Sequence, residues 1–456
     1  MNEHPGPDMK IILISPKMNL RPMDSEFKRL MSPPLGLLTL AALTPHGHDI
    51  RIADENTHDM NMHDQADLVG ITVNVDTSSR AYQLASHFKK RGIPVILGGI
   101  HVSANPEEAL RHADSVCIGE AENVWADILA NRETGGLKKI YKSDDPVNPR
   151  RIPLPARNLI SSSKYLYTNI MYTSRGCPFK CDFCYNSCDY ITNRHRNRPT
   201  NQIIDEIKSF HTRQVMFIDD NFIGNIPWTA DFLKKIKPLN LTWHAAVSSN
   251  LVHHKDLILL MRESGCRSLF IGFESINHDS LKSVRKRQNQ IDRYQELIRF
   301  LHQNGIMINA SMVFGFDEDT PNVFSNTLHW LVKNKIETVT AHILTPYPGT
   351  ELYKRLKAEN RITDFNRNHY NTSNVVFRPK RMSAEELKQG YLQIYREFYS
   401  YKNIFARMPI GKKRQIPYIL FNLGYRKFGK VTSKLGRLGL MNTIGRLARR
   451  LSYGIG

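Results

Sequence analysis

The chain has 456 residues, six cysteines and a formal net charge of +20. A chain of this length forms two or three domains whose cores need no disulfide staples, so six scattered or clustered cysteines indicate a reduced, cytoplasmic protein rather than a secreted one. No run of about 18 apolar residues and no signal-peptide pattern occurs, so we expect no membrane-spanning segment.

Residues 9–135 alternate short apolar runs with helix-like segments. The runs include "MKIILISP", "ADLVGITVNV" and "PVILGGIHV". Continuous Val, Ile and Leu runs between helices are typical of parallel strands that are covered on both faces. The sequence therefore predicts an N-terminal doubly wound, Rossmann-like α/β domain with about five strands.

Ligands of such sheets bind at the carboxyl ends of the strands, where glycines allow a large planar molecule to approach the backbone. The predicted strand ends give a candidate ligand edge at Ser15, Asn74, Gly98, Gly99, His101, Gly119 and Glu120.

Residues 136–165 are polar and contain several prolines, which predicts a linker. Residues 166–355 contain a second series of six strand candidates, most of them separated by helical stretches. This series predicts a partial or full β/α (TIM-like) barrel with its active site at the carboxyl ends of the strands.

A cysteine cluster, "SRGCPFKCDFCYNSC", lies in the first loop of the predicted barrel. Cys177, Cys181 and Cys184 have the spacing C-x3-C-x2-C, which allows three thiolates to hold three irons of a 4Fe-4S cube and leaves the fourth iron open. A structural zinc site with Cys188 as fourth ligand is the alternative, followed by a disulfide or free thiols. Cys117 and Cys266 lie far from this loop and are expected to be buried apolar residues.

The loop, with the aromatic Phe183 before its third cysteine, resembles the radical S-adenosylmethionine (SAM) superfamily. The motifs "FIDDNF", "GFES", "MVFGFDEDT" and "TPYPGTELY" at later strands are similar to those of the subfamily with an N-terminal cobalamin-binding-type domain. The patterns "PPLGLLTLAAL", "GGIHVSANPEEAL" and "GEAE" in the first domain agree with the same subfamily.

The resemblance implies that Cys177, Cys181 and Cys184 bind the 4Fe-4S cluster and that the reduced cluster cleaves SAM to a 5′-deoxyadenosyl radical. For each further SAM contact, a strand-end cap or a core residue is the alternative. The implied contacts are Phe183 beside the cluster, Asp219, Asp220 and Asn221 at the amino group, Glu274 and Ser275 at the ribose or methionyl group, and Phe314 and Gly315 at the adenine.

Cobalamin is implied at the ligand edge of the first domain, although the signature Asp-x-His-x-x-Gly is absent and "DENTHD" has the wrong spacing. The corrin would then have no protein ligand below cobalt. The implied reaction is methylation of an unactivated carbon in a hydrophobic, lipid or isoprenoid-like substrate, with an electron donor such as flavodoxin or ferredoxin. Cobalamin-independent cyclisation, rearrangement or carbon–carbon bond formation is the alternative.

Residues 356–456 are predicted to form a helical region that ends in a basic tail, because no Asp or Glu occurs from Lys402 onward. Residues 431–451 place apolar residues at helical spacing between Lys and Arg, which predicts an amphipathic helix at an anionic membrane, here its inner face. Docking on the barrel and binding of RNA phosphates are the alternatives. An RNA-methylthiolating enzyme is disfavoured, since such enzymes carry a cysteine-bearing N-terminal domain and this one has only Cys117.

Overall fold

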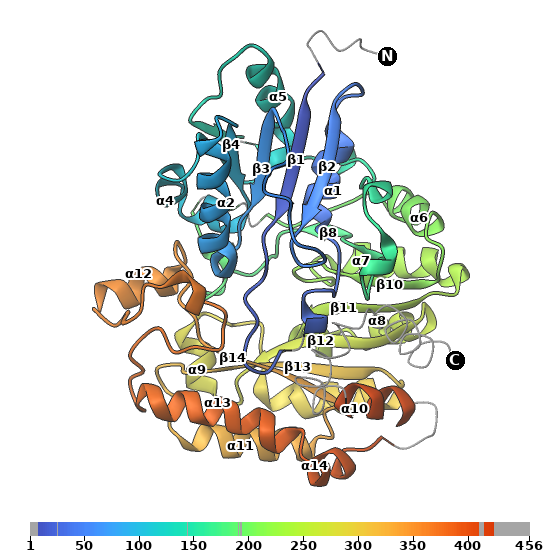
Figure 1. Cartoon of the computed structure of the whole chain (residues 1–456). Helices are drawn as coiled ribbons and strands as arrows, with labels where there is room; N and C mark the ends of the chain where they lie inside the picture. The colour runs from blue at the N-terminus through green and yellow to red at the C-terminus, as the bar shows by residue number, and fades with distance from the viewer. Residues whose placement is uncertain are drawn as a thin grey trace.

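The computed structural model describes residues 8–24, 26–143, 145–189, 191, 194–409 and 415–423. Two six-stranded sheets, in which all strand pairs are parallel, form the frame (Figure 1), so the predicted α/β class is confirmed. None of the helices in the described part of the chain is long and apolar enough to cross a bilayer. The predicted membrane-binding helix at 431–451 lies outside the described residues, so membrane contact stays a prediction.

The first sheet has the strand order β2-β1-β3-β4-β5-β6, with helices on both faces. Its strands are β1 (Lys10–Ser15), β2 (Asp49–Asp54), β3 (Leu68–Thr72), β4 (Val95–Gly98), β5 (Ser115–Ile118) and β6 (Ile140–Lys142). Its helices are α1 (Leu35–Leu43), α2 (Ser78–Lys90), α3 (Ile100–Ala104), α4 (Pro106–Leu110) and α5 (Trp125–Glu133).

The apolar run of β1 serves two separate cores, which explains why it does not alternate with polar residues. Ile12 and Ile14 belong to the core that contains Phe88 of α2. Ile11 and Leu13 belong to the core on the opposite face. Successive side chains of a strand point to opposite faces, so both sets must be apolar when helices cover both faces.

The first sheet extends further than predicted. β6 pairs with β5 although it lies within 136–165, the range predicted as linker, so the sheet has six strands rather than about five. Only Tyr141 of the three residues in β6 is buried. A strand this short, at the edge of a sheet and next to lysines, produces no apolar run that sequence analysis could detect.

The second sheet has the order β14-β13-β12-β11-β10-β7 and forms a partial barrel, because β14 and β7 do not pair with each other. Its strands are β7 (Ile170–Met171), β10 (Gln214–Phe217), β11 (Thr242–Ser248), β12 (Cys266–Glu274), β13 (Met307–Phe314) and β14 (Thr338–Ile343). The helices after them are α6 (Thr200–Lys208), α7 (Ile226–Ile236), α8 (Lys255–Glu263), α9 (His278–Ser283), α10 (Tyr294–Gln303), α11 (Asn322–Lys333) and α12 (Glu351–Ala358). The ribbon of β8 (Ser174–Arg175) and β9 (Arg196–Asn197) is antiparallel.

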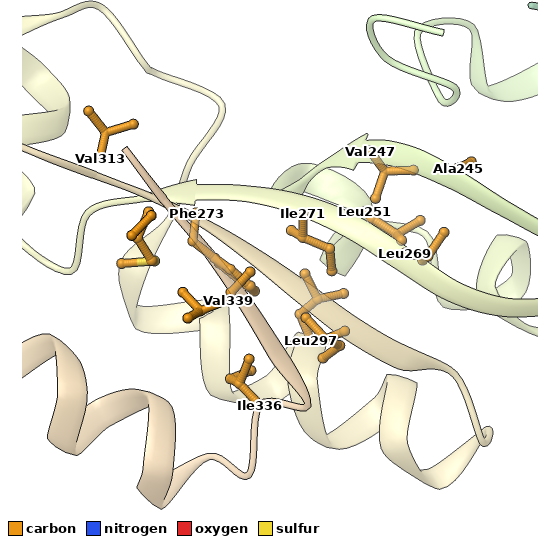
Figure 2. Packing of buried hydrophobic residues seen from close by; sticks show 14 of the residues in the cluster. Ala245, Val247, Leu251, Leu269, Ile271, Phe273, Leu297, Val313, Ile336 and Val339 are labelled. Atoms are coloured by element: carbon orange, nitrogen blue, oxygen red, sulfur yellow. The ribbon is translucent and has the colours of Figure 1, made fainter. Parts of the chain in front are cut away.

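The main core lies between the outer face of this sheet and its helices. Figure 2 shows part of it, with side chains from β11, β12 and α10: Ala245, Val247, Leu269, Ile271, Phe273 and Leu297. Because side chains alternate along a strand, the residues between these, such as His244 and Ser268, face the interior of the barrel.

Two tyrosines cover the free edge of β14. The hydroxyl of Tyr395, on α13 (Ala384–Phe398), donates to the Ala341 carbonyl oxygen and accepts from the Ala341 N–H, both at 3.0 Å. The Tyr399 hydroxyl, just after α13, bonds both backbone groups of Val339 in the same way. These bonds replace a neighbouring strand and prevent edge-to-edge pairing. The chain continues into α14 (Tyr401–Ala406).

We expect Tyr395→Phe to expose this edge. Loss of the hydroxyl leaves a buried N–H and C=O without partners, which costs about 1–3 kcal/mol. Amide hydrogen exchange in a peptide covering β14 should therefore accelerate about tenfold. Tyr353→Phe is the matched control, because the Tyr353 hydroxyl makes no hydrogen bond with the described residues. Equal exchange in both variants would contradict the role given to Tyr395.

Candidate active site

The cysteine loop follows β7 and lies between β8 and β9. Cys181 is buried, Cys177 and Cys184 are half-buried, and none of them forms a disulfide. Burial raises the pKa of Cys177 to about 11 and that of Cys184 to about 12, and the neighbouring Cys181 adds to both shifts. The three sulfurs are therefore close enough to interact, and their thiolate forms need a nearby cation.

No three His, Cys, Asp or Glu side chains in the described ranges are arranged to hold a single metal ion. Thiolates that each bind a different iron of a cube need not converge on one point. The loop therefore suits a cluster with separate metal atoms better than one shared ion. Cys188, the fourth ligand in the alternative of a zinc site, is also buried.

A cation and an amide reach the cysteines from the loop after α9. The Lys286 ammonium lies 2.8 Å from Glu274 Oε1, and Gln288 Nε2 lies 3.4 Å from Cys181 Sγ. Burial disfavours the charged form of Lys286, but Glu274 and the thiols of Cys181 and Cys184 outweigh burial and raise its pKa. The sequence analysis missed Lys286 and Gln288, which stand in a basic stretch without a distinctive spacing.

Glu274 ends β12 with a left-handed backbone, φ +64°. Its second carboxylate oxygen accepts a hydrogen bond from Ser311 Oγ at 3.1 Å. A Cβ at Gly272 would stand 2.6 Å from Glu274 Oε1, so the glycine of "GFES" leaves room for the glutamate. Ser275 instead caps the following turn, since its hydroxyl accepts the Asn277 N–H at 3.0 Å.

The three polar residues after β10 have different roles. Asp219 Oδ1 accepts hydrogen bonds from the backbone and side chains of Thr173 and Ser174, and so fixes the start of the cysteine loop. Asn221 Oδ1 accepts the Ser248 N–H at 3.2 Å. Asp220 is exposed and close enough to Cys177 to raise the pKa of that thiol. Of the three, Asp220 is the one whose carboxylate is open toward the cysteines.

At the end of β13 the aromatic residue beside the loop is Phe316 rather than Phe314. Phe314 is buried in the core, with its ring centroid 5.0 Å from that of Phe324. The ring of Phe316 lies 6.3 Å from that of Phe183, whose face also meets the Lys286 ammonium at 5.7 Å. Gly315 has φ +101°, and a Cβ there would stand 2.7 Å from Leu387 of α13.

The candidate edge of the first sheet is partly open to solvent. Asn74 and Gly119 are exposed, Ser15, Gly98 and Gly99 are half-buried, and Ile100 keeps 37% of its surface exposed. Gly99 has φ +102°, and a Cβ there would meet the Val73 backbone at 2.8 Å. His101 differs from the others, because its ring is fully buried and its Nε2 lies 3.2 Å from Glu108. Its imidazole therefore does not face the edge.

Glu120 and Glu122, after β5, bind arginines that flank the cysteine loop. Glu120 lies 3.1 Å from Arg175 and 2.9 Å from Arg196, and Glu122 forms a further close ion pair with Arg175. The hydroxyl of a fifth residue, Tyr172, accepts a hydrogen bond from Arg175 at 2.7 Å. All five side chains are mostly buried. We call Glu120, Glu122, Arg175 and Arg196 the inter-sheet clamp, since they join the edge of the first sheet to the cysteine loop.

Other contacts bring the two carboxyl edges together. Within the barrel, the rings of Tyr185, next to Cys184, and Tyr347, after β14, stack at 5.0 Å and join the cysteine loop to the loop that contains Gly349. A Cβ at Gly349 would stand 2.8 Å from the Ala104 carbonyl oxygen of α3. The candidate ligand edge of the first sheet and the cysteine loop therefore belong to one site between the sheets.

Comparisons with known proteins agree with this arrangement. Residues 171–331 match the Radical SAM superfamily, residues 29–129 match the B12 binding domain, and residues 350–412 match a domain of unknown function, DUF4070.

Two curated relatives match most of the chain. Bacteriochlorophyllide d C-12(1)-methyltransferase of Chlorobaculum tepidum is 30% identical over 413 residues, which cover 88% of this chain and 89% of the relative. Hopanoid C-2 methylase of Rhodopseudomonas palustris is 30% identical over 362 residues, which cover 76% of this chain and 67% of the relative.

Solved structures share the fold at low identity. The cobalamin-dependent SAM radical enzyme OxsB, with aqua-cobalamin and SAM bound, has a TM-score of 0.63 and 16% identity, and covers 97% of this chain and 72% of its own. The methyltransferase TsrM of Kitasatospora setae, with cobalamin and a [4Fe-4S] cluster, has a TM-score of 0.63 and 16% identity, and covers 77% of this chain and 75% of its own.

We expect Arg175→Met to loosen the cysteine loop, because it leaves the Glu122 carboxylate buried without its cation. Breaking a buried ion pair in this way costs about 3–5 kcal/mol. Hydrogen exchange across 174–188 should accelerate, and the iron retained per chain after anaerobic reconstitution should fall.

Adding Glu122→Gln to Arg175→Met should restore part of the loss, since it removes the uncompensated charge. Glu263→Gln, which breaks the exposed pair with Lys237, is the control and should change nothing. Normal iron retention and exchange in Arg175→Met would show that the clamp does not hold the loop.

Proposed function

The chain belongs to the radical SAM superfamily, among the cobalamin-dependent methyltransferases, and we propose that it methylates an unactivated carbon of a hydrophobic substrate. Its cofactors are a 4Fe-4S cluster, SAM and cobalamin. The observation that supports the proposal most is the juxtaposition of the cysteine loop with the ligand edge of the first sheet through the inter-sheet clamp.

We assign the cluster to the thiolates of Cys177, Cys181 and Cys184. Their mutual proximity and the nearby Lys286 ammonium fit a group that needs anionic sulfur ligands and carries negative charge of its own. Lys286 forms an ion pair with Glu274 at 2.8 Å and adds a positive charge beside the sulfurs. Phe183 and Phe316 exclude water from the same side.

We assign SAM to the space bordered by the cysteine loop, Asp220 and Glu274. Asp220 offers an open carboxylate for an amino group, and Glu274 is held in one orientation by Lys286 and Ser311. The Asn221 side-chain nitrogen is buried and has no hydrogen-bond partner among the described residues. These three residues offer polar contacts to a ligand that carries an ammonium group, a sulfonium and the two hydroxyls of a ribose.

We assign cobalamin to the edge formed by Asn74, Gly98, Gly99 and Gly119. The exposed Ile100 and the half-buried glycines give a broad apolar and backbone surface for a planar macrocycle. When bound, the cofactors supply a 5′-deoxyadenosyl radical and a methyl group for transfer. The protein's part is to hold both near one substrate carbon and to exclude water.

The substrate class is inferred from the relatives and from the barrel lining. The relatives are named for bacteriochlorophyllide and hopanoid substrates. The polar residues that face the barrel interior bind one another, as in His244 with Ser268 at 2.6 Å and Thr340 with Asn309 at 3.0 Å. These pairs lie toward the amino ends of their strands, so the polar groups of the barrel interior below the site are paired without a substrate. We expect an electron donor of the flavodoxin or ferredoxin type.

Replacing Cys177, Cys181 and Cys184 together by Ala should abolish both iron binding and the formation of 5′-deoxyadenosine from SAM. Cys188→Ala, in the same loop, is the matched control and should keep both. Iron per chain and 5′-deoxyadenosine are measured after anaerobic reconstitution and reduction. Loss of the cluster in Cys188→Ala, or its survival in the triple variant, would refute the ligand assignment.

Hydroxocobalamin should remain bound to the protein through gel filtration, with an absorption spectrum that shows no histidine ligand. His101→Ala should leave this spectrum unchanged, because the His101 imidazole faces Glu108 inside the domain. A spectral change in His101→Ala would show that this histidine ligates cobalt. Elution of the protein free of corrin would remove the assignment of the edge to cobalamin.

A further inference from the structure

The segment that follows α9, residues 284–290, lies against the cysteine loop. The Asp182 N–H donates to the Val284 carbonyl oxygen at 3.2 Å. Arg285 forms an ion pair with the Asp182 carboxylate at 3.5 Å. The backbone and a side chain at the start of the segment therefore hold it beside Cys181.

Asn289 fixes the other end of this segment to β12. Its side-chain nitrogen lies 2.8 Å from each of three acceptors: the carbonyl oxygens of Gly272 and Phe273 and the hydroxyl of Tyr294. The Tyr294 hydroxyl in turn donates to the Phe273 carbonyl oxygen at 2.9 Å. The segment is thus anchored at both ends, which fixes the backbone at Gln288.

Gln288 directs its side-chain amide at a cysteine sulfur. Its Nε2 lies 3.4 Å from Cys181 Sγ. Cys181 is buried and Gln288 is half-buried, so this contact is largely shielded from water. A thiolate sulfur has no proton to donate, so the NH₂ group of the amide, and not its oxygen, must face it. The contact is therefore an N–H···S hydrogen bond to a sulfur that we assign to the cluster.

The other two cysteines of the cluster receive hydrogen bonds from the backbone. These come from Phe179 for Cys177 and from Asn186 for Cys184, and they oppose the effect of burial on the pKa of each thiol. Each of the three sulfurs thus has a donor. The donor to Cys181 is a side chain, which can be replaced without altering the backbone of the cysteine loop.

Hydrogen bonds to the sulfurs help to set the reduction potential of an iron–sulfur cluster. Reduction adds one electron, and so one negative charge, to the cluster and its thiolates. A donor directed at one of these sulfurs stabilises the more negative, reduced state to a greater extent than the oxidised state, especially where water is excluded. Such a donor therefore raises the reduction potential.

We propose that Gln288 raises the reduction potential of the 4Fe-4S cluster through its hydrogen bond to Cys181. It thereby favours the transfer of one electron from a donor of the flavodoxin or ferredoxin type, which is oxidised by one electron in this step. Gln288 acts through Cys181 as a positioning residue and needs no contact with SAM. The inference rests on the proposed function, since it concerns the cluster of the same site.

The test is a redox titration of the reconstituted full chain, in which electron paramagnetic resonance follows the reduced cluster. Gln288→Leu removes the donor and should shift the equilibrium about tenfold toward the oxidised cluster, which lowers the potential by about 59 mV for one electron. Gln288→His keeps an N–H donor and should restore most of the potential. Gln290→Leu is the matched control and should leave the potential unchanged, because the Gln290 side chain is exposed and makes no hydrogen bond with the described residues.

An unchanged potential in Gln288→Leu, or an equal fall in Gln290→Leu, would overturn the proposal. A measurement on the unaltered chain does not depend on any variant. With nitrogen-15 in the side-chain amides of glutamine, pulsed electron paramagnetic resonance of the reduced cluster should show a coupling to nitrogen-15 through the hydrogen bond. Absence of this coupling would equally overturn the proposal.

Cleavage of SAM is measured in the same samples with Ti(III) citrate, a reductant strong enough to reduce the cluster in every variant. Formation of 5′-deoxyadenosine without a difference in potential refutes only the role of Gln288. A lower potential in Gln288→Leu without 5′-deoxyadenosine in the unaltered chain refutes only the proposed function.

Discussion

Glu120 and Glu122, which follow β5 of the first sheet, fix the position of the cysteine loop. The loop has little regular structure of its own, only the two-residue strands β8 and β9 beside it. Glu120 and Glu122 hold it through Arg175 and Arg196 at both of these strands. Because the pairs are mostly buried, neither partner can leave without a large energetic cost, so the two ligand edges keep a fixed distance. In the function that we propose, the joint action of two cofactors on one carbon depends on this constraint.

Local patterns in the sequence predicted much of the fold and identified the cysteine loop as part of the candidate site. Continuous apolar runs predicted β1, β3 and β4, because helices cover both faces of that sheet. The "GFES" motif is also a local signal, because a Cβ at Gly272 would stand 2.6 Å from the Glu274 carboxylate. Along β13, Ala310, Met312 and Phe314 lie on the core face, and Phe316, beyond the strand end, is buried in the same cluster with its ring 6.3 Å from that of Phe183. The adenine contact assigned to Phe314 stays a prediction.

Features that depend on partners distant in sequence could not be predicted. Glu120 was expected at the corrin edge, yet its carboxylate binds arginines more than fifty residues away. Lys286 and Gln288 reach the cysteines only because α9 and the following loop fold back over the barrel rim.

The most direct test of the account follows the methyl group of SAM and needs no knowledge of the substrate. Holoenzyme is given SAM labelled with carbon-13 in its methyl group, with reduced cobalamin bound, and the corrin is then isolated. The account predicts that the label appears on the corrin together with an equal amount of S-adenosylhomocysteine. Formation of 5′-deoxyadenosine and labelled methionine alone, with an unlabelled corrin, would contradict a methyltransferase in which both sheets serve one reaction.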